Sequence, residues 1–358
     1  MISKKRIKKV VYGLVALCLA LGILGLTGCG KSSEDEMIII TDCSGAEVSI
    51  PKNFDKVIAT PPAFVEFMTA MGQADKLVGT HGSVLGQSWA PLFYDGFSDM
   101  ALYGYKPTAE EIYAADADFV VVKNAAYAET LRDDGIPALY FGYNNLEELY
   151  YAVDMMGEIF GGEAKDFAEN WKKYTEETIN QIQSEVAGVS EDEKRNIYYI
   201  NAAVNPGDLY TTYGGNSFVE YWINTIGANL VTSAYPDIEE IEKEVALSLE
   251  PDTIFISGYA EYTRYDELTT DPLWSDKVPV INNEIYMMPT SLVTFDRFAV
   301  ELPVLLSYSA NKIYPELHSF DGIEELRSFY KDFYGIDFTD EQLNNMLLGL
   351  NVDGSRMD

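Results

Sequence analysis

Glu163 to Val186, EAKDFAENWKKYTEETINQIQSEV, contains neither proline nor glycine, and this pattern predicts one long helix. Apolar or aromatic-rich positions recur three or four residues apart, which predicts one packed stripe on it: Phe167, Trp171, Tyr174, Thr178 and Ile182. The helix is either an ordinary core helix of one large domain or a connector between two. Its flanking sequence favours a connector.

Short apolar, β-branched runs lie on both sides of this helix. Four precede it, at 56–60, 76–80, 118–123 and 138–141, and three follow it, at 196–200, 253–257 and 284–288. Their apolar character is continuous instead of alternating, which is typical of parallel strands covered on both faces. We therefore expect an α/β protein with two Rossmann-like lobes joined by a long backbone helix, and a ligand cleft between the lobes.

An internal repeat supports two related lobes. Phe64-Val65-Glu66-Phe67 recurs as Phe218-Val219-Glu220-Tyr221, and each copy ends at a glycine, Gly72 or Gly227. Each copy predicts a short helix with one glutamate in its first turn, where a helix dipole favours an acid, and four-letter matches also arise by chance. If the repeat is real, Glu66 and Glu220 are equivalent carboxylates that could grip a symmetric partner.

The first 29 residues have the features of an export signal. Five basic residues between Lys4 and Lys9 precede an uncharged, leucine-rich run from Val10 to Leu26. The run ends in Leu26-Thr27-Gly28-Cys29, which resembles a bacterial lipobox, in which the cysteine is lipidated and becomes the first residue. An uncleaved anchor with an incidental cysteine is the alternative. We expect a lipid anchor at Cys29 on the extracytoplasmic face of the cell membrane.

Composition excludes several classes of function. The chain has 358 residues, with 57 Asp and Glu against 25 Lys and Arg, so its net charge of −32 would repel nucleic acid. Three cysteines and two histidines cannot build a zinc module, a disulfide scaffold or a three-histidine cage. After export and lipidation, Cys43 would be the remaining free cysteine. We expect it to be either an inert turn residue or a reactive free thiol. No motif for a hydrolase, a metalloprotease or a phosphate-binding loop is present.

Several segments together resemble one known family. They are Thr41-Asp42 with Gly45, Val48 and Pro51; Gly227-Ala228-Asn229-Leu230; 245–257 (VALSLEPDTIFIS); Trp274 with 282–286; and 311–316 (NKIYPE). In order and spacing they resemble the ABC-importer binding proteins for iron chelates, haem and corrinoids, over roughly residues 37 to 317. The resemblance implies two Rossmann-like lobes on a rigid backbone helix and a ligand held in the cleft.

The residue patterns and the resemblance together predict a division of the chain, and the resemblance also implies a docking mode. The expected parts are a signal peptide (1–28), a lipidated tether (29–36), an N-terminal lobe (37–161), a connecting helix (162–190), a C-terminal lobe (191–317) and a C-terminal helical extension (318–358). Glu66 and Glu220 would dock on arginines of the permease dimer, which works with an ATPase. We expect a monomer that touches the membrane only through its lipid.

Loops at the carboxyl ends of parallel strands supply the expected ligand site. The candidate ligand-binding residues are His81, Tyr105, Tyr127, Tyr213, Tyr259, Arg264 and Arg297. Many tyrosines are packing residues, and each arginine could instead form a surface ion pair. His81 could ligate iron, reach a chelate or only bond a loop. Gly104-Tyr105 followed by Ala109-Glu110 is similar to the axial tyrosine segment of haem-binding relatives, with a spacer two residues shorter.

An anionic ferric siderophore is the first expectation for the ligand, because aromatic walls and a few cations suit a bulky anion. Haem and a corrinoid are alternatives within the same class. A free zinc or manganese ion would need more histidines, and a secreted enzyme would need a catalytic constellation. We therefore expect no catalytic residues, no resident metal site and no intrinsic cofactor.

Overall fold

A computed structural model describes residues 36–202, 209–236, 238, 240–258 and 261–357 of the chain. Residues 36–38 and 51–53 form a small unit of their own, in which Lys52 Nζ lies 2.9 Å from Glu36 Oε1. The lipobox and Tyr259 lie outside the described residues. Among those described, no helix is both long and apolar enough to cross a membrane.

The N-lobe is built on a five-stranded parallel sheet in the order β5-β4-β3-β6-β7. Its strands are β3 (Val57–Ala59), β4 (Leu77–His81), β5 (Ala101–Tyr103), β6 (Phe119–Val122) and β7 (Ala138–Tyr140). The helices between and around them are α2 (Pro62–Ala70), α3 (Gly82–Leu85), α4 (Ala90–Phe93), α5 (Ala109–Ala114), α6 (Ala125–Asp133) and α7 (Leu146–Phe160). A hairpin of β1 (Met37–Thr41) and β2 (Glu47–Pro51) forms a separate two-stranded sheet.

The C-lobe repeats the pattern with a four-stranded parallel sheet in the order β11-β10-β8-β9. Its strands are β8 (Asn196–Asn201), β9 (Asn229–Leu230), β10 (Thr253–Ser257) and β11 (Ile285–Met287). Its helices are α9 (Phe218–Thr225), α10 (Lys243–Ser248), α11 (Glu261–Thr270), α12 (Val278–Ile281) and α13 (Leu302–Ile313). The expected α/β class with two lobes is confirmed, and all seven predicted strands are present within one or two residues of their predicted ends.

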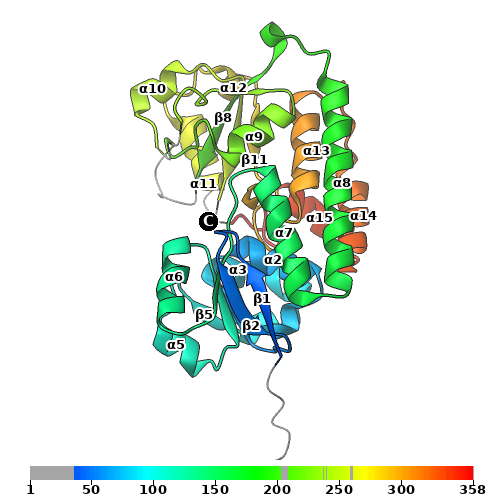
Figure 1. Cartoon of the computed structure of the whole chain (residues 1–358). Helices are drawn as coiled ribbons and strands as arrows, with labels where there is room; N and C mark the ends of the chain where they lie inside the picture. The colour runs from blue at the N-terminus through cyan, green and yellow to red at the C-terminus, as the bar shows by residue number, and fades with distance from the viewer. Residues whose placement is uncertain (1–35, 203–208, 237, 239, 259–260, 358) are drawn as a thin grey trace, which may run out of the picture. The chain divides into compact units, whose positions relative to one another are not determined.

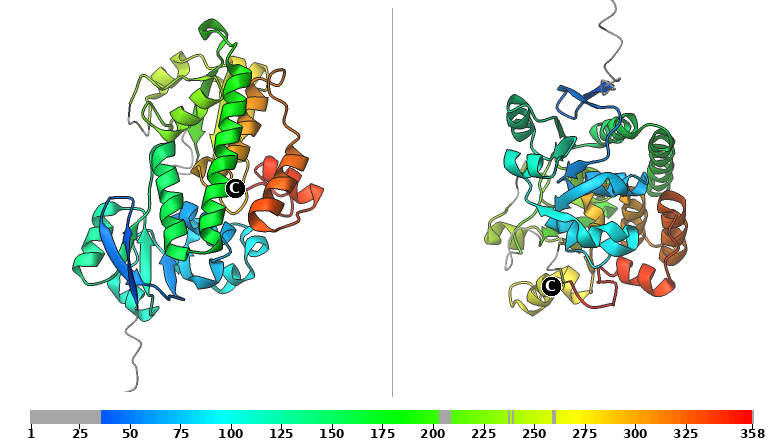
Figure 2. Two further views of the ribbon diagram at one scale, coloured as in Figure 1. Left: turned by 45° about the vertical axis from the view of Figure 1, so that its right-hand side comes forward. Right: turned by 90° about the horizontal axis from the view of Figure 1, so that it is seen from below.

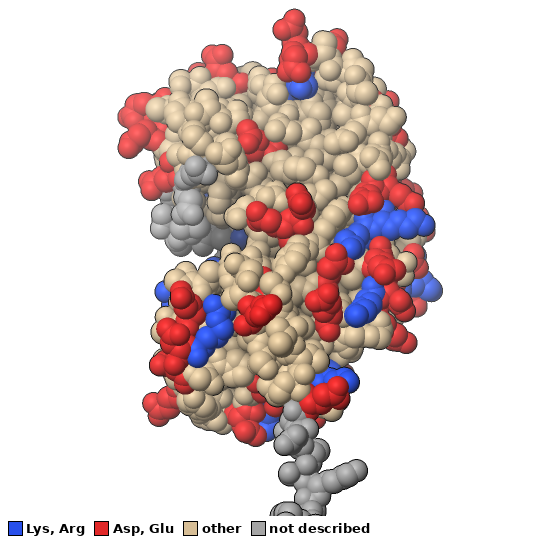
Figure 3. Space-filling model, in the orientation of Figure 1, with Lys and Arg blue, Asp and Glu red and all other residues tan. Residues whose placement is uncertain are grey.

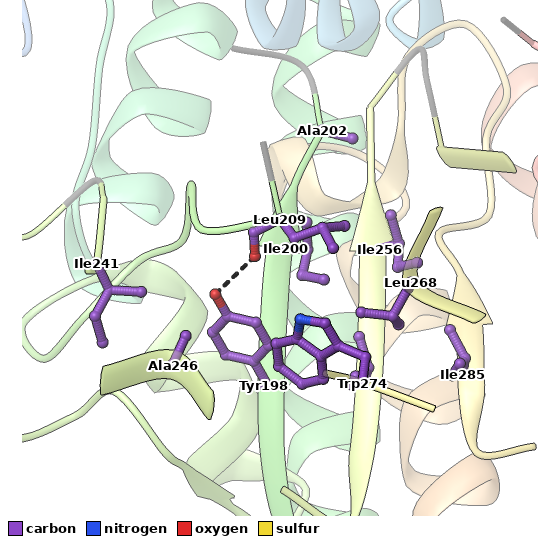
Figure 4. Close-up of a cluster of buried hydrophobic side chains, with 11 residues drawn as sticks. Tyr198, Ile200, Ala202, Leu209, Ile241, Ala246, Ile256, Leu268, Trp274 and Ile285 are labelled. Carbon is purple, nitrogen blue, oxygen red and sulfur yellow. Dashed lines mark hydrogen bonds between the residues drawn. The ribbon is translucent and has the colours of Figure 1, made fainter. Parts of the chain in front are cut away.

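Each sheet has its own buried core. In the C-lobe, Tyr198 stacks on Trp274 with ring centroids 5.9 Å apart, and both side chains are fully buried (Figure 4). The Tyr198 hydroxyl donates to the Leu209 carbonyl oxygen at 2.9 Å, so this buried polar atom is satisfied. In the N-lobe, Ile58 and Val120 pack with Leu131 of α6. Each lobe therefore has buried hydrophobic residues of its own packed around its sheet.

Helix α8 (Glu163–Val186) connects the lobes with the bounds that the sequence predicts. It lies alongside α7 and α13 (Figure 1). The predicted apolar stripe is only partly right, because Trp171 and Ile182 are buried while Tyr174 is exposed. The buried face instead follows Ala164, Ala168, Trp171, Thr175, Ile179, Ile182 and Val186.

The remaining aromatic residues of α8 contact the C-terminal extension, which we define as residues 322–357. It contains α14 (Gly322–Tyr334) and α15 (Asp340–Leu347). The Phe333 ring lies 5.7 Å from that of Phe167 and 5.5 Å from that of Tyr174, and Figure 2 shows α14 beside α8. Helix α8 therefore packs on two faces, one toward the lobes and one toward the extension.

Candidate functional site

A cleft of about 990 Å³ lies where the carboxyl ends of the two parallel sheets face each other. The N-lobe contributes residues at or just after the ends of its strands, among them His81, Lys123 and 141–144. The C-lobe contributes Asn201, 215–219 around the start of α9, 293–294 and 296–298. This is the position at which open α/β sheets bind ligands, and the volume is at the upper end of the range for small-molecule sites.

Three side chains stack on the N-lobe wall. The His81 and Tyr105 rings are nearly parallel, with centroids 3.6 Å apart and 13° between their planes. Lys123 Nζ lies 3.5 Å from the centroid of the same Tyr105 ring. Two groups this close to one centroid cannot share a face, so His81 and Lys123 cover opposite faces of Tyr105. The lysine makes a cation–π contact there.

The His81 ring is held by the start of α3. Its Nδ1 accepts a hydrogen bond from the Ser83 backbone N–H at 3.0 Å and lies 2.8 Å from Ser83 Oγ. Partial burial, and then the nearby Lys123 charge, lower the pKa of His81 below its usual range. The neutral imidazole is therefore the dominant form at neutral pH.

The C-lobe wall is polar and aromatic. Asn201 Nδ2 donates to the Tyr213 hydroxyl at 3.3 Å, and the Tyr199 hydroxyl donates to Asp296 Oδ2. Arg297 ends a short 3-10 helix and is followed by Phe298, whose backbone has φ +52°. Phe298 can hold this left-handed conformation because its ring stacks on that of Phe218, with centroids 4.4 Å apart.

One tyrosine links the two walls at the base of the cleft. The Tyr143 hydroxyl donates to the carbonyl oxygens of Arg297 and Phe298 at 3.0 and 3.1 Å. Burial raises the pKa of this phenol far above its usual range, so it remains a donor at any physiological pH. The contact fixes the segment that carries Arg297 against the N-lobe.

The charge of the cleft differs from that of the chain. Among the described lining residues, Lys123 and Arg297 are cations and Asp296 is the one carboxylate. The chain as a whole carries more than two acids for each base, and Figure 3 shows Asp and Glu spread over both lobes. The described lining thus has one more cation than carboxylate, whereas the chain as a whole is strongly acidic.

The sequence places this fold in a family. Residues 57–292 match the periplasmic binding protein family. The chain belongs to this family. The chain is 24% identical over 317 residues to an uncharacterized ABC transporter substrate-binding lipoprotein, YvrC, of Bacillus subtilis, covering 83% of this chain and 96% of YvrC.

Solved structures share the fold of this periplasmic binding protein. A periplasmic solute binding protein from Veillonella parvula superposes with a TM-score of 0.73 at 22% identity, covering 88% of this chain and 97% of that one. The molybdate-binding protein MolA of Haemophilus influenzae superposes with a TM-score of 0.71 at 19% identity, covering 84% and 99%. At these identities the likeness shows the fold and leaves the ligand open.

Four of the seven residues predicted to bind ligand line the cleft of this periplasmic binding protein: His81, Tyr105, Tyr213 and Arg297. Their role in binding stays a prediction. Tyr127 and Arg264 do not line the cleft, so this expectation is corrected. The Tyr127 hydroxyl donates to the Pro107 carbonyl oxygen, and Arg264 is buried on α11 and paired with Glu267.

Sequence reasoning missed Lys123 and Asp296. Lys123 directly follows β6, so the rule that selected residues after strands could have found it. The apolar run at 118–123 includes Lys123, so the pattern predicts it as part of the strand. Asp296 gave no separate signal, since its place in the cleft depends on the turn at Phe298. Within the described residues, no three His, Cys, Asp or Glu side chains gather where they could hold a metal ion.

The two glutamates of the repeat have different environments. Glu220 is the third residue of α9 and half-buried, and its Oε2 accepts from the Asn216 N–H at 2.9 Å. Glu66 lies beyond the first turn, because α2 begins at Pro62, and its side chain is only 1% exposed. The prediction that each glutamate lies in the first turn of its helix is therefore wrong for Glu66, whose face of α2 is covered by other elements.

Proposed function

We propose that this periplasmic binding protein captures an anionic metal chelate, with a ferric siderophore as the first candidate, and delivers it to an ABC importer. The observation that carries the proposal is the pair of cations, Lys123 and Arg297, on opposite walls of an aromatic cleft in a strongly acidic chain. A charge-assisted bond is stronger there than in water. The similarity to a substrate-binding lipoprotein supports transport instead of catalysis.

Titration of the purified protein tests the ligand class. The probes are a ferric tris-catecholate, haem, cobalamin and free Zn²⁺, followed by tryptophan fluorescence and calorimetry. We expect tight binding of the ferric chelate, and Arg297→Ala should weaken it about tenfold to a hundredfold, as for a lost charge-assisted bond. Lys106→Ala is the matched control, because Lys106 lies over the Tyr127 ring, outside the cleft lining.

Other results would change the proposal. Preferred binding of haem or cobalamin would keep the transport role and replace the siderophore. Tight binding of Zn²⁺ or of an uncharged sugar, with no binding of the three large probes, would contradict an anionic chelate as ligand.

The proposal includes a lipid anchor at Cys29 and delivery at the extracytoplasmic face of the membrane. The sequence Leu26-Thr27-Gly28-Cys29 and the similarity to a lipoprotein support it. Cys29→Ala should release the protein from the membrane or leave the signal uncleaved. Mass spectrometry of the native N-terminus checks this, and an unmodified Cys29 in a membrane-bound protein would contradict it.

We also propose that Glu220 contacts the permease. It lies in the first turn of α9, and part of its side chain is accessible. Glu220→Lys should reduce uptake by placing a like charge against a basic partner, while ligand affinity in solution changes less than about threefold. Loss of ligand affinity in a folded variant would assign Glu220 to the cleft instead. Glu66 is not part of this proposal, because it is buried.

A further inference from the structure

The stack of His81, Tyr105 and Lys123 limits what the histidine can do. A backbone N–H only donates, so the His81 Nδ1 that accepts from Ser83 at 3.0 Å must carry a lone pair. The single proton of the neutral ring then resides on Nε2. With Nδ1 engaged by the backbone, Nε2–H is the ring group left for a ligand in the cleft that His81 lines.

Metal ligation by His81 would require a different tautomer. A metal bound at Nε2 needs the lone pair there, which moves the proton to Nδ1. That proton would point at the Ser83 N–H, and two donors would face each other at hydrogen-bond distance. The stacking on Tyr105, with 13° between the rings, also keeps the imidazole plane parallel to the phenol. The local structure therefore holds His81 as a donor.

Lys123 presents a second donor from the other face of Tyr105. Its ammonium group lies 3.5 Å above the ring centroid and has no acceptor capacity. The two N–H groups are kept apart by the thickness of the aromatic ring, which neither can cross. They thus offer two fixed donors to separate oxygen atoms of one ligand.

We infer that His81 and Lys123 form a donor pair, spaced by Tyr105, that binds oxygen anions on the periphery of the ligand, and that His81 does not ligate the metal. The ligand class is a chelate whose carboxylate, phenolate or catecholate oxygens remain accessible. This inference rests on the proposed function. It names the N-lobe side chains that recognise the chelate, and it excludes coordination of the metal by His81.

The tautomer can be measured without any ligand. Long-range ¹H–¹⁵N spectra of the uniformly ¹⁵N-labelled protein at pH 8 report which ring nitrogen carries the proton. The chain has two histidines, and the signals absent from a His81→Gln variant identify those of His81. We expect the Nε2–H form. The Nδ1–H form would overturn the inference, whatever the ligand.

Affinities for a ferric tris-catecholate test the role of each donor. Glutamine retains an N–H donor at the end of its side chain, so His81→Gln should stay within about threefold of wild type while His81→Leu loses about tenfold. Lys123→Met should lose about tenfold to a hundredfold and Lys123→Arg less than about threefold, because arginine keeps the charge and the donors. An uncharged ferric trihydroxamate should be far less sensitive to Lys123→Met.

Two outcomes distinguish a wrong donor pair from a wrong proposed function. If His81→Gln is as weak as His81→Leu, and wild type binds free Ni²⁺ tightly while both variants do not, His81 is a metal ligand. If wild type binds neither chelate, the proposed function fails, and titration with metal-free citrate then decides the inference: shifts of the His81 and Lys123 side-chain signals support it, and their absence overturns it.

Discussion

A buried pair of carboxyl groups joins three parts of the protein. Glu66 of α2 and Glu301, directly before α13, are each 1% exposed. Glu301 Oε1 accepts from Ser291 Oγ at 3.0 Å and from the Tyr334 hydroxyl of α14 at 3.3 Å. Burial, and then the charge of Glu301, raise the pKa of Glu66 well above its usual range. Burial likewise raises the pKa of Glu301.

This pair predicts that stability falls as pH rises. A raised pKa in the folded state means that the folded protein favours the protonated acids. The stabilisation is therefore complete below the unfolded pKa of about 4.3 and is lost as pH rises through the folded values. Glu66→Gln, which is neutral at every pH, should be about 1 to 3 kcal/mol more stable than wild type at pH 8 and similar to it near pH 4.5. Urea unfolding at both pH values checks this.

Glu169→Gln is the matched control, because Glu169 is exposed on α8. Its stability difference from wild type should hardly depend on pH. An equal pH dependence in the two variants, or a wild type that is the more stable protein at pH 8, would contradict a buried protonated pair.

Cys43 illustrates a second effect of burial on a single side chain. It is the free cysteine in the described part of the chain, and burial raises the pKa of its thiol to about 11. The thiolate is the reactive species, so Cys43 should react with a disulfide reagent at pH 7 far more slowly than free cysteine does. Unfolding in urea should restore the normal rate. Fast reaction of the folded protein would contradict the turn-residue interpretation.

At the scale of elements, the end of α9 depends on a glycine. Gly227 has φ +77°, and a Cβ atom added there would lie 2.8 Å from Val186 Cγ2 at the end of α8. Two requirements therefore coincide at one residue, a left-handed backbone and a close approach to the connecting helix.

Gly227→Ala should reduce stability more than an alanine at a left-handed position without close neighbours does. Gly335, which ends α14, has φ +68° and no atom within 4 Å of an added Cβ. Gly335→Ala should therefore cost about 1 kcal/mol, and Gly227→Ala about 2 to 4 kcal/mol, because overpacking adds to the backbone strain. Thermal unfolding of both variants measures the difference. Equal losses would show that Val186 moves aside.

At the scale of the whole molecule, the end of the C-terminal extension bonds to both lobes. On the N-lobe, the buried Trp89 indole N–H donates to the Leu350 carbonyl oxygen at 2.9 Å, and Ser88 Oγ accepts from the Val352 N–H at 3.0 Å. On the C-lobe, Arg356 Nη1 lies 2.8 Å from Asp266 Oδ2 on α11. These contacts tie the lobes together independently of α8.

Removal of residues 349–358 should loosen both lobes at once. The Trp89 N–H would lose its partner inside a buried site, so we expect about 2 to 4 kcal/mol less stability. Hydrogen exchange should become faster near residues 86–93 and near 262–268. Lys331→Ala is the control, because it removes an exposed ion pair with Asp337 inside the extension. Faster exchange confined to the extension would contradict a tie between the lobes.

The local sequence pattern was sufficient to predict most helices and strands and the fold class. Helix α8 has its predicted ends, because an unbroken helical segment is bounded by glycine on the N-terminal side and by Ala187-Gly188 on the other. The short apolar, β-branched runs form strands, because continuous apolar character is also a local pattern. Strands β5 and β9 were missed, since three and two residues give no period, and Ala101 and Leu102 of β5 are exposed.

The environment of single side chains was decided by the tertiary structure. The periodicity of α2 predicts a helix but cannot say that α14, more than 250 residues later, covers the face that bears Glu66. Arg264 was expected in a loop after a strand, but it lies on α11, where its side chain is buried and pairs with the partly exposed Glu267. Lys123 lines the cleft because β6 ends beside Tyr105. Secondary structure follows from neighbours in sequence, whereas burial, pKa and access to a ligand depend on contacts between distant segments.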